Sequence, residues 1–340
     1  MSATHDEKDK MMKAWTLAAR PKGMPRDEDF SLVEQPLPEL ADGQVRVANR
    51  WLSVDPYMRG RMNDGKSYVP PFQLGEPMQG GAIGEVVESR AETVPVGTLV
   101  SHMAGWRDEA LIPAQHVQPL PNLGVDPQAF LGQFGMPGMT AYYGLLQVAE
   151  AKPGDTVFVS AAAGAVGSTV VQIAKAKGMT VIGSAGGRDK TDWVRSLGAD
   201  AVIDYKGDMS VVEALGKAAP DGIDVYFDNV GGEVLEAVLP LMRLHGRVAV
   251  CGMVGQYNDA DHPHGVRTLW QLVVNRIRMQ GFITYDYPQV LGQAQAELDA
   301  WVAEGKLKPL ANVRDGFETL PQAFIDLMSG RTIGKTLVRI

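Results

Sequence analysis

The feature that most constrains the fold is a run of β-branched and aromatic residues, followed by small residues and then by a regularly spaced apolar pattern. Residues 156–159 read Thr-Val-Phe-Val, and small residues fill positions 161–165. Apolar residues then recur at helical spacing from Val166 to Lys175. This order predicts a buried strand, a tight turn and a helix. The first N–H groups of such a helix are unpaired, and together with the helix dipole they favour a phosphate at its beginning.

The turn matches the dinucleotide-binding pattern G-x-G-x-x-G except at its first glycine. Ala162 stands at that position, and Gly164 and Gly167 occupy the other two. Gly164 allows the backbone to approach a pyrophosphate, and Gly167 allows the helix to pack closely on the sheet. The pattern therefore indicates a dinucleotide site. An ordinary close packing of strand and helix, without a ligand, is the alternative that the motif alone leaves open.

Size and charge exclude several classes of protein. A chain of 340 residues is long enough for two domains with separate cores. The net charge of −8 and the pI of about 5.3 give no basic surface for nucleic acid or for an anionic membrane. Residues 127–149 and 156–174 lack charges, but neither stretch has the pattern of a membrane span. The polar N-terminus has no apolar signal segment, so we expect a cytoplasmic enzyme.

The usual zinc sites are not expected, and we predict no metal. Cys251 is the one cysteine of the chain, which excludes a disulfide framework and a multi-cysteine zinc site. Hydride chemistry would then rely on hydrogen bonds instead of a metal Lewis acid. Four histidines could be weighed as metal ligands: His102, His116, His262 and His264. We expect each of them to be a surface or loop residue instead.

Composition changes along the chain indicate where the domains begin and end. Residues 1–10 form a polar tail. Residues 11–130 are rich in β-branched residues, proline and glycine, which predicts a β-rich domain with strands at 12–18, 44–54, 82–89 and 99–103. Residues 286–340 contain two helical stretches, 288–304 and 321–329, and a last strand at 336–340. We expect this segment to return to the first domain.

Residues 131–285 alternate between strands and helices. This alternation predicts an α/β fold with a doubly wound, parallel, six-stranded sheet of the Rossmann type, whose ligand binds at the carboxyl ends of the strands. The expected strands are 156–160, 180–184, 201–204, 223–229, 246–251 and 279–285. The expected helices are 138–147, 166–177, 190–197, 210–218, 233–239 and 269–276.

The end of the second of these strands indicates which dinucleotide is bound. Sheets that bind NAD carry an acidic residue there, which takes the ribose 2′-hydroxyl. Here residues 183–187 contain no acid, and Arg188 and Lys190 follow. A cationic pocket without an acid suits a 2′-phosphate, so we predict NADP(H). The alternative is that both side chains are solvated charges at the start of a helix.

Several segments together resemble one family. They are similar to the zinc-free branch of the medium-chain dehydrogenase/reductase superfamily, which includes prostaglandin and leukotriene reductases, alkenal double-bond reductases and curcumin reductases. The order and spacing of the segments carry the resemblance, and they extend over residues 12–340. The segments are 54–62 (VDPYMRGRM), 135–142 (GMPGMTAY), 161–168 (AAAGAVGS), 204–206 (DYK), 227–232 (FDNVGG), 251–258 (CGMVGQYN), 281–283 (GFI) and 334–335 (GK).

The resemblance implies a fold and a set of site residues. Residues 11–130 would form a GroES-like catalytic domain completed by residues 286–340, and residues 131–285 the NADP-binding Rossmann domain of a homodimer. Tyr257 and Tyr57 would be catalytic, and with Met136 they would line the substrate pocket. The implied cofactor-binding residues are Gly164, Ala165, Val166, Gly167, Lys190, Tyr205, Asn229, Cys251, Gly252, Met253, Tyr257, Phe282, Ile283 and Thr284.

Some residues depart from the family or have an ordinary explanation. Thr332 stands where the family often has asparagine, which puts a cofactor contact there in doubt. Tyr57 would otherwise be a half-buried aromatic residue after a proline turn, and Tyr257 a loop residue without a catalytic role. We interpret Cys251 as a small buried residue at a strand end, not as a reactive thiol.

The predicted activity is NADPH-dependent reduction of the C=C bond of α,β-unsaturated ketones and aldehydes, without zinc. A hydride would reach the β-carbon, and a donor such as Tyr257 would stabilise the enolate oxygen. A quinone reductase of the same fold is one alternative. A non-catalytic NADPH-binding protein is an alternative from another class.

Overall fold

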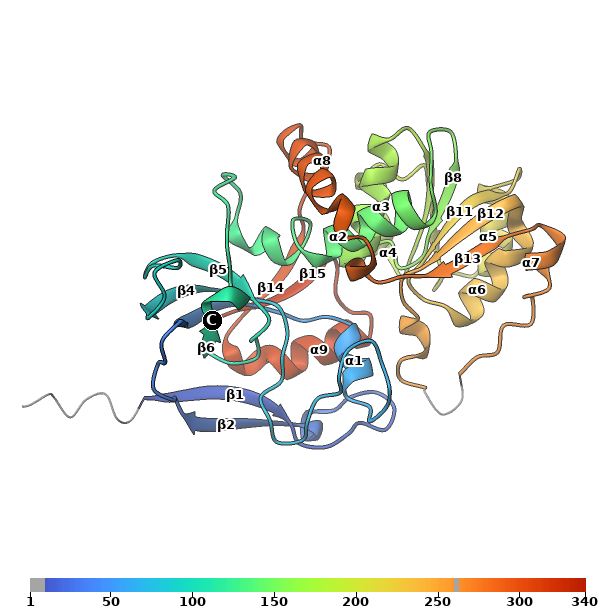
Figure 1. The fold of residues 1–340 in the computed structure, drawn as a ribbon. Coiled ribbons are helices and arrows are strands. Elements are labelled where there is room, and N and C mark those ends of the chain that lie inside the picture. The colour runs from blue at the N-terminus through green and yellow to red at the C-terminus, as the bar shows by residue number, and fades with distance from the viewer. Residues whose placement is uncertain (1–9, 260–262) are drawn as a thin grey trace, which may run out of the picture. The chain divides into compact units, whose positions relative to one another are not determined.

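The computed structural model describes residues 10–259 and 263–340 and divides the chain into two compact units (Figure 1). The first unit extends to Leu131 and takes up Asn312–Arg331 and Thr336–Ile340. The second unit comprises Gly132–Ala311 and Thr332–Lys335. In the described residues, no helix has both the length and the apolar character needed to cross a membrane.

The second unit is built on a parallel, six-stranded sheet, as the sequence predicts. The strand order is β10-β9-β8-β11-β12-β13, and every pair is parallel. The chain first builds β8, β9 and β10 toward one edge and then adds β11, β12 and β13 on the other side of β8. The strand order therefore reverses between β8 and β11, which is where a doubly wound sheet accepts a ligand. The strands are β8 (Thr156–Val159), β9 (Thr180–Ala185), β10 (Ala201–Asp204), β11 (Ile223–Asp228), β12 (Met242–Val250) and β13 (Arg278–Gly281).

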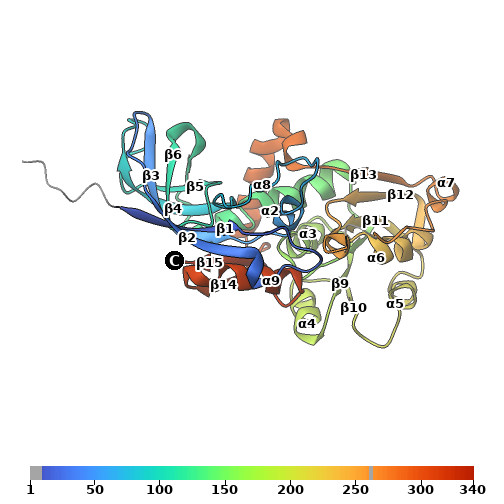
Figure 2. The same cartoon turned by 90° about the horizontal axis from the view of Figure 1, so that it is seen from below.

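Helices cover both faces of this sheet (Figures 1 and 2). Alternate residues of β8 show why: Val157 and Val159 belong to one apolar core, and Phe158 belongs to another. The first core takes up side chains of α3 (Ala165–Ala176) and α4 (Arg188–Ser196). The second takes up side chains of α5 (Val211–Ala218) and α6 (Gly232–Val238). The helix α7 (Gln271–Val274) precedes β13.

The helix α8 (Leu291–Ala303) corrects one expectation about the C-terminal segment. The sequence predicts that residues 286–340 return to the first domain, yet residues up to Ala311 belong to the second unit. The cause is packing against α2 (Met136–Tyr142), which continues into a π-helical segment, Tyr143–Val148. The Tyr142 hydroxyl donates to Glu297 at 3.1 Å, and the Tyr142 and Trp301 rings lie 6.3 Å apart.

The first unit is mainly a seven-stranded sheet in the order β14-β15-β3-β4-β5-β7, with β6 paired to β3. A separate antiparallel pair, β1 and β2, precedes this sheet in the chain. The expected strands correspond to β1, β3, β4, β5 and β15, whereas β2, β6, β7 and β14 were not predicted. The bounds are β1 (Met11–Leu17), β2 (Phe30–Pro36), β3 (Gln44–Ser53), β4 (Ala82–Ser89), β5 (Leu99–His102), β6 (Glu109–Pro113), β7 (Gln118–Pro119), β14 (Ala311–Asp315) and β15 (Lys335–Arg339).

The C-terminal residues of the first unit return to its core, as the sequence analysis expected for this part of the chain. The helix α9 (Leu320–Met328) contributes Phe324, whose ring lies 6.2 Å from both Phe30 and Trp106. The Trp15 indole N–H donates to the Phe317 carbonyl at 3.0 Å. These contacts join segments more than about two hundred residues apart in sequence and bury the rings that stabilise the unit.

Candidate functional site

The turn between β8 and α3 has no space for a side chain at Gly167. A Cβ atom there would lie 2.3 Å from the Ala161 carbonyl oxygen and 2.9 Å from the Ala162 Cα atom. Ala161 itself has a positive φ of 48°, which bends the backbone out of β8. Gly164 caps the helix, so Ala165 and Val166 supply its first N–H groups. These groups point away from the helix body and suit an anion such as a pyrophosphate.

A segment from the C-terminus reaches the same turn. The Gly334 N–H donates to the Ala163 carbonyl at 2.8 Å, and Gly334 forms a parallel bridge with Gly164. Gly334 has a φ of 71°, and a Cβ atom there would lie 2.7 Å from the Leu310 carbonyl oxygen. This glycine belongs to a segment that resembles the family, but it is not among the predicted site residues. Thr332 belongs to the same unit and is buried.

The residues at the carboxyl ends of β9 and β10 form a partly exposed cationic site. Burial lowers the pKa of Lys190, and the neighbouring Lys206 ammonium lowers it further. Burial raises the pKa of Tyr205, and the Asp204 carboxylate adds to that shift. The Tyr205 ring covers Gly186, where a Cβ atom would lie 2.6 Å from the hydroxyl oxygen. A dianionic phosphate would relieve the repulsion between the two ammonium groups.

The remaining charged groups at this edge have other roles. The Arg188 side chain is 92% exposed and pairs with Asp192, so it is a solvated charge at the helix start. The carboxylate of Asp204 accepts hydrogen bonds from the Gly187 and Lys206 backbone N–H groups, both at 2.9 Å. Asp204 thus shapes the loop after β9. Of the two cations that the sequence singled out, Lys190 is the half-buried one.

The loop after β11 is joined to the loop after β8. The Asn229 side-chain amide donates to the Ser160 carbonyl at 2.7 Å, and its backbone N–H donates to the Ser160 hydroxyl at 2.9 Å. Ser160 follows β8 directly, so these contacts lie where the strand order reverses. Asn229, predicted from the family segment, is therefore fixed at the position where a doubly wound sheet binds its ligand.

The loop after β12 carries Cys251, Gly252 and Met253. The backbone N–H groups of Cys251 and Gly252 donate to the Asp228 carbonyl at 2.8 and 3.1 Å. Burial, with the nearby Asp228 charge, raises the pKa of the Cys251 thiol to about 12. The thiol is therefore neutral at physiological pH, which does not suit a nucleophile. Cys251 is half-buried and packs against the first apolar core, so it is less buried than expected.

Tyr257 lies just after a short 3-10 helix, Val254–Gln256, and turns back toward this loop. The Met253 N–H donates to the Tyr257 hydroxyl oxygen at 3.4 Å, and a Cβ atom at Gly252 would lie 3.1 Å from that oxygen. The phenol is thus held at the carboxyl end of β12. The chain following β13 reaches the same edge of the sheet, since the strands are parallel, and it holds Phe282, Ile283 and Thr284.

Two of these residues have identified contacts. The Phe282 ring packs edge-on against Phe227 at 6.3 Å. The Ile283 N–H donates to the Asp286 carboxylate at 3.1 Å, which fixes the turn that contains Thr284. Met136, at the start of α2, is exposed. The second unit therefore gathers its predicted cofactor residues at the carboxyl edge of one sheet.

Tyr57 belongs to the first unit and begins the helix α1 (Tyr57–Arg61). Arg61, one turn later, is buried and donates to the Pro70 carbonyl and the Gln79 side chain, both at 2.9 Å. Its guanidinium also lies 4.1 Å from the centre of the Phe72 ring. Burial lowers the pKa of Arg61, and the Tyr57 hydroxyl opposes this shift. Sequence reasoning did not single out Arg61, although its segment carried the resemblance.

The histidines do not all lie where they were expected. His102 is buried on β5, and burial with the nearby Arg107 charge lowers its pKa to about 4, so the expectation of a surface or loop position is wrong. His116 is exposed, and His264 contacts Glu236 at 3.1 Å. His262 lies outside the described residues. Within residues 10–259 and 263–340, no three His, Cys, Asp or Glu side chains gather as a metal site would require.

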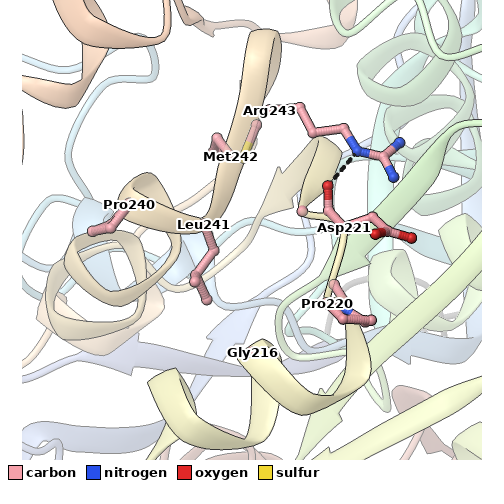
Figure 3. Close-up of a pocket in the computed structure, with 9 residues that line it drawn as sticks. Gly216, Pro220, Asp221, Pro240, Leu241, Met242 and Arg243 are labelled. Carbon is pink, nitrogen blue, oxygen red and sulfur yellow. Dashed lines mark hydrogen bonds between the residues drawn. The ribbon is translucent and has the colours of Figure 1, made fainter.

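A surface hollow of about 310 Å³ lies elsewhere on the second unit (Figure 3). Pro220, Asp221, Leu241 and Arg243 are among its lining residues, and the Arg243 guanidinium donates to the Asp221 carbonyl at 2.7 Å. These residues come just before β11 and at the beginning of β12. The hollow therefore lies at the amino ends of the strands, opposite the edge that carries the predicted site residues.

Comparisons with known proteins cover nearly the whole chain. Residues 13–120 match the family "N-terminal domain of oxidoreductase", and residues 165–299 match the family "Zinc-binding dehydrogenase". The chain is 42% identical over 334 residues to an NADPH-dependent curcumin reductase of Escherichia coli, with 96% of each protein covered. It is 41% identical over 325 residues to a 2-alkenal reductase (NADP(+)-dependent) of Nicotiana tabacum, with 94% of each covered.

A solved structure shows the same similarity in three dimensions. The crystal structure of CurA from Vibrio vulnificus in complex with NADPH superimposes with a TM-score of 0.92 at 41% sequence identity. The match covers 96% of this chain and 98% of that one.

Proposed function

This chain belongs to the zinc-free branch of the medium-chain dehydrogenase/reductase family, and from that premise we propose that it is an NADPH-dependent reductase of the C=C bond of α,β-unsaturated ketones and aldehydes. The observation that carries the proposal is the similarity over the full chain to reductases whose names state NADPH or an alkenal. The resemblance noted in the sequence and the structural match to an NADPH complex agree with it.

The residues of the second unit fit NADPH. Lys190 and Lys206 place two cations at the end of β9 and β10, where a 2′-phosphate would offset their repulsion. The beginning of α3 presents backbone N–H groups for the pyrophosphate, and Gly167 permits the close packing of that helix. The rest of the cofactor would then lie along the carboxyl edge. The residues that would contact it there are Asn229, Gly252, Met253, Phe282, Ile283 and Thr284.

We assign the chemistry to the tyrosines. When bound, NADPH supplies a hydride to the β-carbon of the enone. Negative charge then develops on the carbonyl oxygen, and the Tyr257 hydroxyl donates a hydrogen bond to it, which lowers the barrier. The Met253 N–H holds the Tyr257 oxygen and so orients the phenol for this task. Tyr57 and Met136 are proposed as substrate-lining residues, and a proton from water or a tyrosine completes the saturated product.

We also propose that the reaction needs no zinc. The chain has a single cysteine, so the cysteine ligands of the zinc-dependent relatives cannot be assembled, although one matching family bears the name of zinc-binding dehydrogenases. Hydrogen bonds then activate the carbonyl group. Activity should survive exhaustive chelation, and loss of turnover that zinc restores would contradict the proposal.

A substrate panel tests the reaction. Enones, enals and quinones are supplied with NADPH, and the products are identified. Saturated ketones or aldehydes would support the proposal. Hydroquinones formed without reduction of enones would instead favour a quinone reductase of the same fold. Tight binding of NADPH without turnover of any compound would favour a non-catalytic NADPH-binding protein.

We propose that the protein forms a homodimer. We also propose that it is a cytoplasmic enzyme, whose single cysteine is reduced. Within the described residues β13 pairs only with β12, and all its residues are exposed. Nearby in sequence, Trp270 is 64% and Val273 78% exposed. An unpaired edge with apolar neighbours suits the same edge of a second copy. Light scattering should give twice the monomer mass, and Val273→Glu should shift the population toward monomer.

A further inference from the structure

The buried carboxyl group of Asp228 is used neither by the proposed chemistry nor by a salt bridge among the described residues. Asp228 ends β11 and is fully buried. Its Oδ1 atom accepts hydrogen bonds from the Tyr226 hydroxyl at 2.6 Å and from the Val230 and Gly231 N–H groups at 2.9 and 2.8 Å. Its Oδ2 atom is buried and has no hydrogen-bond partner among residues 10–259 and 263–340. Such a group costs free energy, so its retention needs a reason.

The Tyr226 hydroxyl extends this arrangement to the neighbouring strand. It lies 3.2 Å from the Ser160 hydroxyl, which itself lies 3.3 Å from the Asp228 carboxylate. Burial and the adjacent Asp228 charge raise the pKa of Tyr226 well above its usual value, so the phenol stays protonated and acts as the donor. Its ring stacks on Phe158 at 5.2 Å, which fixes the position of the hydroxyl.

One arm of this network leads to Asn229. The Ser160 hydroxyl accepts the Asn229 backbone N–H at 2.9 Å, and the Ser160 carbonyl accepts the Asn229 side-chain amide at 2.7 Å. The second contact fixes the carboxamide so that Nδ2 faces Ser160. Ser160 therefore holds both the backbone and the side chain of Asn229, and the Ser160 hydroxyl itself lies beside the Asp228 carboxylate.

A second arm leads to Met253 and Tyr257. The N–H group of Gly231 is held by Asp228, and Gly231 has a φ of 69°. A Cβ atom at Gly231 would lie only 2.9 Å from the Met253 Cγ atom, so the two loops are in close contact. Met253 in turn donates its N–H to the Tyr257 hydroxyl. A shift of the turn at residues 229–231 would thus move the loop that orients the phenol.

We propose that Asp228, Tyr226 and Ser160 are positioning residues that hold Asn229 and the loop at 251–253 for the nicotinamide half of the cofactor, while the adenosine half binds independently of them. The proposal rests on the proposed function, because it takes the carboxyl edge as the NADPH site. It is distinct from a general stabilising role, since it assigns the effect to one half of one ligand.

The test compares two ligands and two matched tyrosine variants. Tyr226→Phe keeps the stacked ring and removes the hydroxyl that donates to Asp228. Tyr142→Phe removes the hydroxyl of another buried tyrosine, which donates to Glu297 of α8 and not to the Asp228 network. For each variant the Kd of NADPH and of 2′,5′-ADP, which carries only the adenosine half, is measured by calorimetry. A charge-assisted hydrogen bond implies a rise in the NADPH Kd of about tenfold or more for Tyr226→Phe.

Comparing the Kd values of the two ligands distinguishes a positioning role from general damage to the fold. For Tyr226→Phe we expect the 2′,5′-ADP Kd to stay within about twofold of wild type, because a surface phosphate site is insulated from the network. Tyr142→Phe should leave both constants unchanged. Equal weakening of both ligands by Tyr226→Phe, or an unchanged NADPH Kd, would overturn the proposal.

A second variant keeps the test decisive if Tyr226→Phe does not fold. Ser160→Ala removes the hydroxyl that accepts the Asn229 N–H and should give the same selective loss of NADPH affinity. Both readouts are binding measurements. If the wild-type protein binds NADPH but reduces no enone, the proposed activity is refuted. The positioning roles are still tested in that case, because the Kd values of NADPH and 2′,5′-ADP can be compared without turnover.

Discussion

The two ends of the carboxyl edge in the second unit are built differently. Beside β9 and β10, Lys190, Lys206 and Tyr205 are at least partly exposed and surround a glycine-rich loop. Beside β8 and β11, Tyr226 and Asp228 are fully buried and joined by a short hydrogen bond. Charges near the surface recognise a phosphate but tolerate movement and are screened by salt. A buried network tolerates little displacement, because its groups have no water to replace a lost partner.

The difference predicts which kinetic constant each end controls. In the proposed complex, contacts at the cationic end would be made to the phosphate in every state of the reaction, so their loss should weaken binding uniformly. Contacts at the buried end orient the groups that act on the developing charge, so their loss should lower kcat.

The largest effect is expected from Tyr257→Phe. The phenol is proposed to stabilise the enolate oxygen, and loss of one such donor costs about 10²-fold in kcat, or less where the cofactor's ribose hydroxyl still donates. NADPH affinity should remain close to wild type. The measurement is steady-state turnover of an enone under conditions where hydride transfer limits the rate. Wild-type turnover would remove Tyr257 from the mechanism and make Tyr57 the next candidate.

The next effect is expected from Lys190→Ala, at the other end of the edge. Loss of a charge-assisted contact to the 2′-phosphate should raise the KM for NADPH about tenfold, with kcat little changed. NADH, which lacks this phosphate, should be almost unaffected, and added salt should narrow the gap between wild type and variant. Arg188→Ala is the matched control, because the Arg188 side chain is 92% exposed. Equal efficiency of wild type with both cofactors would reject the assignment.

Two glycine substitutions should show that the start of α3 is more rigid than the loop after β9. At Gly167 a new Cβ atom would meet the Ala161 backbone at 2.3 Å, and a backbone atom cannot move aside cheaply. Gly167→Ala should therefore lower the free energy of unfolding by about 1–3 kcal/mol. At Gly186 the Cβ atom would meet the Tyr205 side chain, which is exposed and can rotate away. Denaturant melts should show a clearly smaller loss for Gly186→Ala; equal losses would contradict the comparison.

The smallest effect is expected at Cys251. Because burial raises the pKa of its thiol to about 12, iodoacetamide at pH 8 should react far more slowly with the folded protein than with the unfolded chain. Cys251→Ala should leave turnover within about twofold of wild type, as for a half-buried residue that only packs against the core. Rapid alkylation with loss of activity would show that the thiol is accessible and ionised.

Local sequence patterns were sufficient for much of the second unit. The strand 201–204 and the helix at 210–218 were predicted almost as they occur, since β-branched residues and the Ser210 and Glu213 capping box act within a few residues. The predicted strand bounds were less accurate where pairing with a neighbouring strand determines where a strand begins. β12 begins at Met242, earlier than expected, because Met242 pairs with Ile223 of β11. In the first unit β2 was missed, as its polar residues become a strand only through pairing with β1.

The candidate site divides in the same way. Gly164, Gly167 and Lys190 could be proposed as site residues from local patterns that follow a strand. Asn229 was proposed from a segment that resembles the family. Arg61 and Gly334 were missed. Arg61 acquires its environment from Pro70, Phe72 and Gln79, and Gly334 reaches the turn after β8 from the far end of the chain. No local spacing encodes such contacts.

The sequence by itself determined the strand–turn–helix at the centre of the sheet, the parallel alternation around it and the preference for a 2′-phosphate. These depend on periodicity, glycine positions and charge, all of which act over a few residues. Tertiary structure alone decided that α8 packs on α2, that His102 is buried and that Asp228 becomes a fully buried carboxylate beside Tyr226 and Ser160. Burial and hydrogen bonding are set by segments distant in sequence, so these properties exist only in the folded chain.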